Sequence, residues 1–147
     1  MTNAEIEQTV ERLLEKDCYV IDFLPVRVPV NSDGRFFAVE EYYLETRGRE
    51  LRRSFSEILL KLYCFYDFII CTGEECRCEN NPPPEKLDNL VLENRGLLNI
   101  LIEKENTLIS VDGESTYITV YNPSKDIIEK LEPLVAANGL FLRRGVN

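Results

Sequence analysis

The sequence has no histidine and no tryptophan among its 147 residues. Without histidine there is no Ser-His-Asp or Cys-His catalytic pair, no histidine general base and no zinc site with an imidazole ligand. The seven glycines are scattered singly, so the glycine-rich loops that cradle phosphates are also missing. These absences exclude several classes of enzyme and select none.

Basic residues are few as well: 17 lysines and arginines against 26 aspartates and glutamates leave a net charge of -9. Nucleic-acid binding calls for a basic face, so nucleic acid is not an expected partner. The most apolar stretch, Phe55 to Cys71, is interrupted by Glu57, Lys61 and Asp67, so no membrane contact is expected either.

The chain does not open with the basic and apolar segments of a secretory signal. Its five cysteines are an odd number, whereas a secreted disulfide scaffold usually has an even and dispersed set. Both observations favour a reduced, cytoplasmic protein.

The length favours one domain covering residues 1–147. The stretch 72–84 is loop-like and ends in three prolines, so the alternative is a division into two subdomains there. Each half would have about 70 residues, which is small for an independent core. A single domain is therefore the prediction.

In the first half, Thr2 and Glu5 have capping-box spacing and begin a helix that reaches about Lys16. Cys18 to Leu24 is rich in β-formers and predicts a strand. A turn at 31–34 follows, and Arg35 to Leu44 is predicted as the strand that returns beside it.

Gly48 is predicted to end that unit, and Ser54 with Glu57 forms a second capping box. The apolar spacing that follows predicts one long helix from about Phe55 to Cys71. The competing interpretation breaks this helix at Asp67 and makes Phe68 to Cys71 a buried strand.

In the second half, a short helix is predicted from Pro84 to just before Gly96. Three strands then form an antiparallel meander: Leu97–Glu103, Thr107–Val111 and Thr116–Tyr121.

Asn122 is predicted to cap a last helix, which contains Pro133, and Leu140 to Leu142 forms a final short strand. The fold class is therefore α+β: a mainly antiparallel sheet of about five or six strands, with the long second helix and the last helix packed on one face.

Two carboxylates form the first candidate site. Asp22 lies inside an apolar strand, and Glu41 lies in the strand predicted to pair with it, on the same face. Such a pair suits Mg²⁺ or acid–base catalysis. The alternative is that both side chains belong to a solvent-exposed sheet face, where charged residues are ordinary.

Arginines and tyrosines form the second candidate. Four arginines precede the predicted helix N-terminus, where an anion would also be favoured by the helix dipole; they are Arg47, Arg49, Arg52 and Arg53. Tyr63 and Tyr66 lie in an aromatic run that covers every side of the helix, which favours a docking partner or a second copy of the chain. Solvated arginines and ordinary core tyrosines are the simpler interpretations.

The third candidate is a thiolate site at Cys71, Cys76 and Cys78, although these spacings match no common zinc or iron–sulfur motif. No resident cofactor is expected. The leading functional hypothesis is a non-enzymatic protein-binding or regulatory domain, for example an acidic inhibitor of a basic toxin. The alternatives are a metal-dependent enzyme that uses Asp22 and Glu41, and a thiolate metal or redox module.

Overall fold

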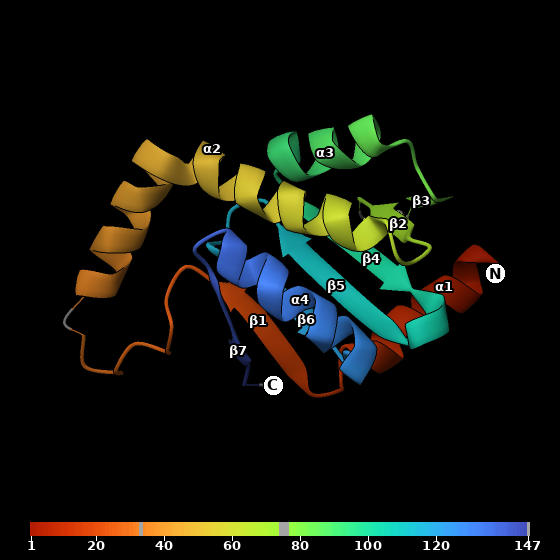
Figure 1. Cartoon of the computed structure of the whole chain (residues 1–147), viewed down its shortest axis with the longest axis horizontal. Coiled ribbons are helices and arrows are strands. Elements are labelled where there is room, and N and C mark those ends of the chain that lie inside the picture. Colours follow the sequence, from red (N-terminus) through yellow and green to blue (C-terminus); the bar gives the residue numbers. More distant parts are fainter. Residues whose placement is uncertain (33, 74–76, 147) are drawn as a thin grey trace.

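The computed structural model describes residues 1–32, 34–73 and 77–146, which form helices and strands in the order α1-β1-α2-β2-β3-α3-β4-β5-β6-α4-β7 (Figure 1). The α-helices are α1 (Asn3–Leu13), α2 (Arg35–Tyr63), α3 (Pro84–Glu93) and α4 (Lys125–Ala137). The strands are β1 (Cys18–Asp22), β2 (Ile69–Thr72), β3 (Arg77–Asn80), β4 (Leu97–Ile102), β5 (Thr107–Asp112), β6 (Tyr117–Tyr121) and β7 (Phe141–Arg144). A short 3-10 helix, Glu103–Glu105, joins β4 to β5.

The strands form a single sheet in the order β3-β2-β4-β5-β6-β1-β7. Every neighbouring pair is antiparallel. The α+β prediction is confirmed, and the sheet is slightly larger than expected. Strands from both sides of the 72–84 stretch share this sheet and its core, so the chain folds as one compact domain.

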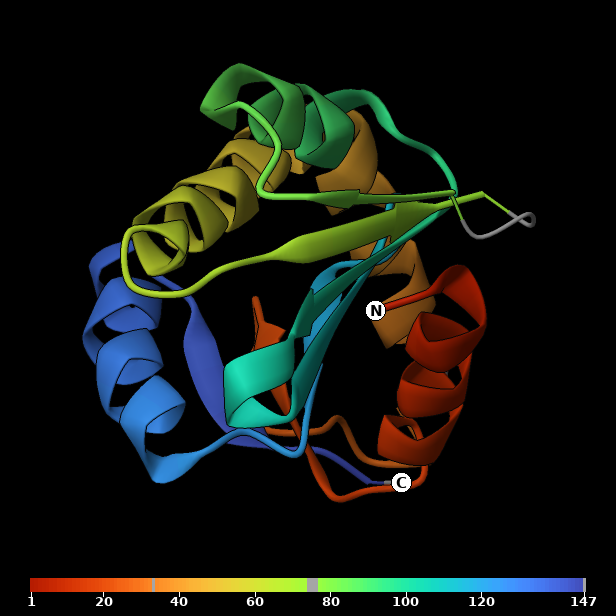
Figure 2. The ribbon, with the colours of Figure 1, turned by 90° about the vertical axis from the view of Figure 1, so that its right-hand side faces the viewer.

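The two faces of the sheet are covered unequally. Helices α2, α3 and α4 pack against one face, where the main core includes Ile70, Ile100 and Ile109. The residues next to them in the strands, such as Leu101 and Leu108, point to the opposite face and contact α1. Figure 2 shows α1 on the side of the sheet opposite α3 and α4. The part of this face over β6, β1 and β7 is left open by α1, and the start of α2 borders it at one end, where Phe36 and Phe37 line a pocket with Asp22, Tyr117 and Arg143.

The largest correction concerns residues 35–44, which were predicted as a strand. They form the first turns of α2, which continues without interruption to Tyr63. The expected hairpin does not exist because both edges of β1 are already occupied, by β6 and by β7. Gly48 does not end an element but lies buried inside the helix, and Ser54 is an interior residue rather than a cap.

The predicted helix from Phe55 to Cys71 is also wrong in its second part. The helix ends at Tyr63, and Ile69–Thr72 forms strand β2, as the competing interpretation proposed. The strand is fixed from both sides, because β2 pairs with β3 and with β4. Residues 77–80, which were expected to be loop, therefore form an edge strand.

Some of the predictions that depend on local signals are confirmed. Thr2 caps α1 by accepting a hydrogen bond from the Glu5 backbone N–H at 3.1 Å, and β4, β5 and β6 form the expected meander. The cap of α4 is shifted: Ser124, not Asn122, accepts the hydrogen bond from the Ile127 N–H, at 3.2 Å. Pro133 lies inside α4, as predicted.

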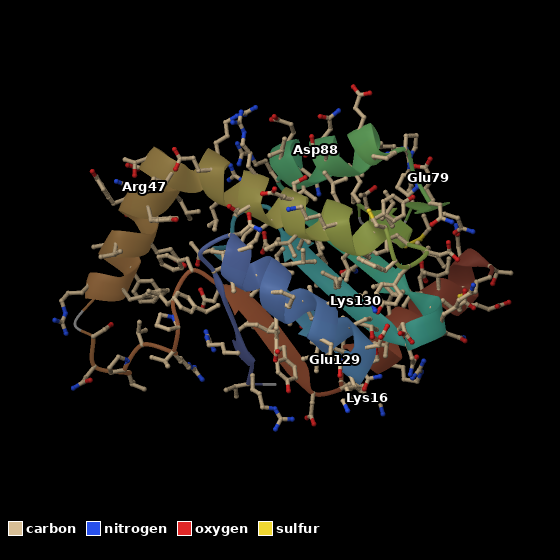
Figure 3. The ribbon with its side chains drawn as sticks, viewed as in Figure 1. Lys16, Arg47, Glu79, Asp88, Glu129 and Lys130 are labelled. Atoms are coloured by element: carbon tan, nitrogen blue, oxygen red, sulfur yellow. A yellow bond between two sulfur atoms is a disulfide. The ribbon has the colours of Figure 1, made fainter. Side chains whose placement is uncertain are left out.

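One segment stands away from this body. The connection after β1 and the first turns of α2, residues 24–32 and 34–42, project beyond the end of the sheet, and α2 bends sharply where they join the rest of the helix (Figure 1). Arg47 lies at this bend (Figure 3), next to the buried Gly48. Glycine inside a helix is a common position for such a bend. We call residues 24–42 the arm.

Candidate interaction site

The structure does not form the predicted carboxylate pair of Asp22 and Glu41. Glu41 is exposed on α2, because the strand in which it was placed is helical. Asp22 is buried at the end of β1, and its Oδ2 accepts a hydrogen bond from Arg143 Nη2 at 2.6 Å. A buried carboxylate needs a partner, and Asp22 finds an arginine from β7 instead of a second carboxylate.

Arg143 keeps unused hydrogen-bonding capacity. Its side chain is 24% exposed and that of Asp22 is 8% exposed. The Nε atom of Arg143 is buried and has no hydrogen-bond partner among the described residues. Arginine carries five N–H donors in a fixed plane, and the bond to Asp22 uses one of them, so the exposed part of this side chain can still donate to a ligand.

The predicted arginine cluster is only partly assembled. The four arginines lie inside α2, which begins at Arg35, and not before a helix N-terminus. The prediction that a helix dipole assists anion binding at this cluster is therefore wrong. Arg49 pairs with Glu93 at 3.4 Å, and Arg52 donates to the Gly113 carbonyl at 3.0 and 3.3 Å.

Burial, and after it repulsion from Arg95, lowers the pKa of the Arg52 guanidinium. Arg95 was missed by the sequence analysis because it lies on a different element. Arg47 and Arg53 are both exposed on α2.

The two candidate tyrosines have structural partners. The Tyr63 hydroxyl donates to the Pro82 carbonyl at 2.8 Å, and its ring stacks on Phe68 at 4.7 Å between centroids. The Tyr66 hydroxyl donates to Asp126. Burial raises the pKa of both hydroxyls, with a further contribution from Asp67 for Tyr63 and from the bond to Asp126 for Tyr66. Both tyrosines therefore hold elements together.

The cysteines do not form the predicted thiolate cluster. Cys71 and Cys78 are opposite residues of β2 and β3, with Cα atoms 4.1 Å apart, and their sulfurs are joined in a disulfide. Disulfide sulfurs are not the thiolates that a metal requires. Cys76 lies outside the described residues. The expectation of a reduced, cytoplasmic protein stays a prediction. This disulfide weighs against the expectation that the cysteines are reduced.

Reduction of the Cys71–Cys78 disulfide is expected to lower the free energy of unfolding by roughly 2 kcal/mol. The disulfide closes a short loop and so restricts the conformations of the unfolded chain, and reduction removes that restriction. Urea unfolding with and without dithiothreitol measures this in a Cys64→Ser/Cys76→Ser background. The matched control adds Cys71→Ala and Cys78→Ala, after which dithiothreitol has no effect. Equal stability of the oxidised and reduced forms would contradict the prediction.

The arm was not anticipated from the sequence, yet it carries a concentration of exposed apolar side chains. Twelve large hydrophobic side chains are exposed in the described part of the chain, and five of these are in the arm: Val26, Val30, Phe37, Val39 and Tyr42. Each of the five is more than half exposed. Isolated exposed apolar residues are normal, but a contiguous group marks an interaction surface.

Two contacts hold the arm to the body at its base. The ring of Phe23 packs on that of Tyr43 with centroids 5.0 Å apart, and Glu40 Oε2 accepts a hydrogen bond from the buried Thr116 at 3.0 Å. The arm is therefore positioned, while its outer surface faces solvent.

Two pockets lie beside the ion pair of Asp22 and Arg143. One, of about 350 Å³, is an open pocket between the arm and the sheet. The other, of about 390 Å³, lies on the part of the sheet that α1 leaves open. Arg27, Tyr117 and Arg143 line both pockets. One signal in the sequence pointed here: a lone aspartate in an apolar strand requires a counter-charge from elsewhere.

None of the helices within the described residues has the length and apolar character needed to cross a membrane. Those residues also contain no group of three or more carboxylates and thiols arranged to hold a metal ion. No protein-family model, curated protein or solved structure matches this chain.

Proposed function

We propose that this protein is a non-enzymatic binding domain that attaches to another protein through the outer surface of the arm. The observation that supports this is the group of exposed apolar side chains on a segment that projects from the body. Aromatic residues such as Tyr42 are enriched at the centres of protein interfaces. Burying them against a partner removes apolar surface from water, which stabilises the complex.

Charge indicates the kind of partner. The arm itself has two arginines and three carboxylates, so it is nearly neutral, whereas the rest of the chain carries almost all of the net charge of -9. An apolar contact surrounded by an acidic body suits a partner with an apolar patch inside a basic rim. Two copies of this chain would repel each other, because both carry the same charge. We therefore propose that the partner is a basic protein and that this protein acts as its acidic inhibitor or regulator.

Replacing Val39 and Tyr42 by glutamine is expected to weaken binding of that partner at least about tenfold, because interface aromatics carry a large share of binding energy. Both residues are exposed on α2, so the fold should keep its stability. The measurement is quantitative affinity capture of basic proteins, beginning with the products of neighbouring genes, followed by titration of each captured protein against both forms.

The matched control is Leu97→Gln/Phe141→Gln, which removes two exposed apolar side chains from the body. This control should bind the partner as the unmodified chain does. The proposal fails if the arm variant retains full affinity, or if the control loses as much affinity as the arm variant. Light scattering that shows a dimer dependent on Val39 and Tyr42 would replace the basic partner by a second copy.

A further inference from the structure

The two pockets beside Asp22 and Arg143 adjoin each other, and together we call them the groove. They share Arg27, Tyr117 and Arg143 as lining residues. The groove passes from beneath the arm, past the ion pair, onto the open part of the sheet. Each half falls within the range of volumes in which proteins bind small ligands.

The half beneath the arm is mainly apolar. Its wall comes from the connection after β1 and from the start of α2, and consists of Leu24, Val26, Val28, Pro29, Val30, Phe36 and Phe37 together with Ser32. Such a wall favours the apolar part of a ligand, since each methylene group buried there contributes favourable transfer free energy.

The junction of the two halves is polar and cationic. Arg143 points one terminal nitrogen to Asp22, at 2.6 Å, while its buried Nε has no partner among the residues that the structure describes. A buried donor without an acceptor is unfavourable. That Nε is closed to a ligand, but the Arg143 side chain as a whole is 24% exposed and lines both pockets. A carboxylate in the groove can accept hydrogen bonds from its exposed part, and a carboxylate matches the planar guanidinium best.

The charge of the lining favours a ligand with one negative charge. Arg27 and Arg143 oppose Asp22, which leaves a single positive charge among the lining residues. A monocarboxylate neutralises it. A phosphate dianion would leave excess negative charge beside Asp22 and close to Glu40, which is bound to the lining residue Thr116. In a chain with a net charge of -9 that excess is unfavourable.

We propose that this groove binds a monocarboxylate attached to an apolar tail, with the carboxylate on Arg143 and the tail beneath the arm. Two sources offer this chemistry: a fatty acid, and the C-terminus of a polypeptide that ends in apolar residues. Three of the exposed arm residues, Val26, Val30 and Phe37, line the groove, whereas Val39 and Tyr42 do not. The two proposals are therefore tested separately, with Val39 and Tyr42 for the protein partner and Arg143 for the carboxylate.

Titration with decanoate and with the peptide acetyl-Val-Leu-Leu tests the proposal, using the ¹H–¹⁵N signal of the Arg143 Nε–H as the readout. Replacing either carboxylate by an amide should weaken binding about tenfold to a hundredfold, because a charge-assisted hydrogen bond is lost. Hexanoate should bind at least about tenfold more weakly than decanoate. Binding of decanoate alone identifies the fatty acid as the source, and binding of the peptide acid alone identifies the polypeptide end.

Arg143→Lys keeps a positive charge beside Asp22 but removes the planar guanidinium, and should weaken decanoate binding at least about tenfold. The matched control is Arg144→Lys, the next residue of β7, whose side chain lies over the Tyr19 ring on the other face. Arg27→Gln gives a second test at an exposed position, where misfolding is not a concern.

Equal binding of acids and amides, equal loss in the Arg143→Lys and Arg144→Lys variants, or no binding of any probe would each overturn the proposal. Val39→Gln/Tyr42→Gln should bind decanoate normally. Failure of the groove proposal therefore leaves the protein-binding proposal standing, and the reverse also holds.

Discussion

Gly113→Ala is expected to lower the free energy of unfolding by roughly 3 kcal/mol, within the range found when atoms are forced into a packed core. Gly113 is buried in the turn between β5 and β6. A methyl group there would overlap the backbone carbonyl oxygen of Asn94 and would lie 2.8 Å from the Arg95 Cα. These are backbone atoms, so no side chain can rotate to make room.

The consequences extend beyond that turn, because three elements meet at Gly113. Its N–H donates to the Gly96 carbonyl at 3.2 Å, and its own carbonyl accepts both hydrogen bonds from Arg52 of α2. Moving the turn away from residues 94–96 strains all of these bonds together. The same turn leads to Thr116, which holds Glu40 at the base of the arm.

Urea unfolding followed by circular dichroism measures the effect, with Gly96→Ala as the matched control. A methyl group at Gly96 would meet nothing closer than the Asn94 Oδ1 at 4.0 Å, so this variant should lose less than about 1 kcal/mol. The melting temperature of Gly113→Ala should fall by roughly 6–12 °C for a domain of this size. Equal stabilities of the two variants would show that the approach to Asn94 is not as close as described.

The contrast between Gly113 and the arm illustrates what the sequence allows one to predict. The meander from Leu97 to Tyr121 is built from neighbouring strands and short turns, so local turn chemistry and β-formers were sufficient to predict it. Helix α1 and its Thr2 cap were predictable for the same reason. The close approach of residues 94–96 to Gly113, in contrast, arises from packing and has no local signature.

The errors have a common physical cause, which is strand pairing over long sequence separations. Residues 35–44 contain aromatic and β-branched side chains and were assigned to a strand beside β1. That position belongs to β6 and β7, which lie about a hundred residues further along the chain. Without a free edge to pair with, the segment is helical, a state that Ala38, Glu40 and Glu41 also favour.

The candidate site follows the same pattern. The sequence correctly marked Asp22 as an unusual charge in an apolar strand. The predicted partner, Glu41, was wrong because it was taken from a nearby part of the chain. The true partner, Arg143, is brought to Asp22 by the β1–β7 pairing. Likewise, the β2–β3 pairing joined Cys71 to Cys78 and thereby removed two of the three predicted thiolates.

Arg143→Leu is expected to destabilise the protein by roughly 3–4 kcal/mol, because it leaves the Asp22 carboxylate buried without its counter-charge. Asp22→Ala should cost less, about 2 kcal/mol, since the Arg143 side chain is more exposed than that of Asp22 (24% against 8%) and retains some contact with water. Asp22→Ala also removes the acceptor, 3.4 Å away, of the Leu24 N–H at the start of the arm.

The double variant Asp22→Ala/Arg143→Leu removes both charges and should be more stable than Arg143→Leu alone, with a coupling energy of about 2 kcal/mol in a double-mutant cycle. Arg144→Leu is the control and should change stability by less than about 1 kcal/mol, because Arg144 is exposed. Additive losses would show that the two side chains do not interact. A gain in stability for Asp22→Ala would instead mean that the Asp22 carboxylate destabilises the fold. Destabilising residues are often retained in binding sites, so this result would indicate that Asp22 serves ligand binding in the groove.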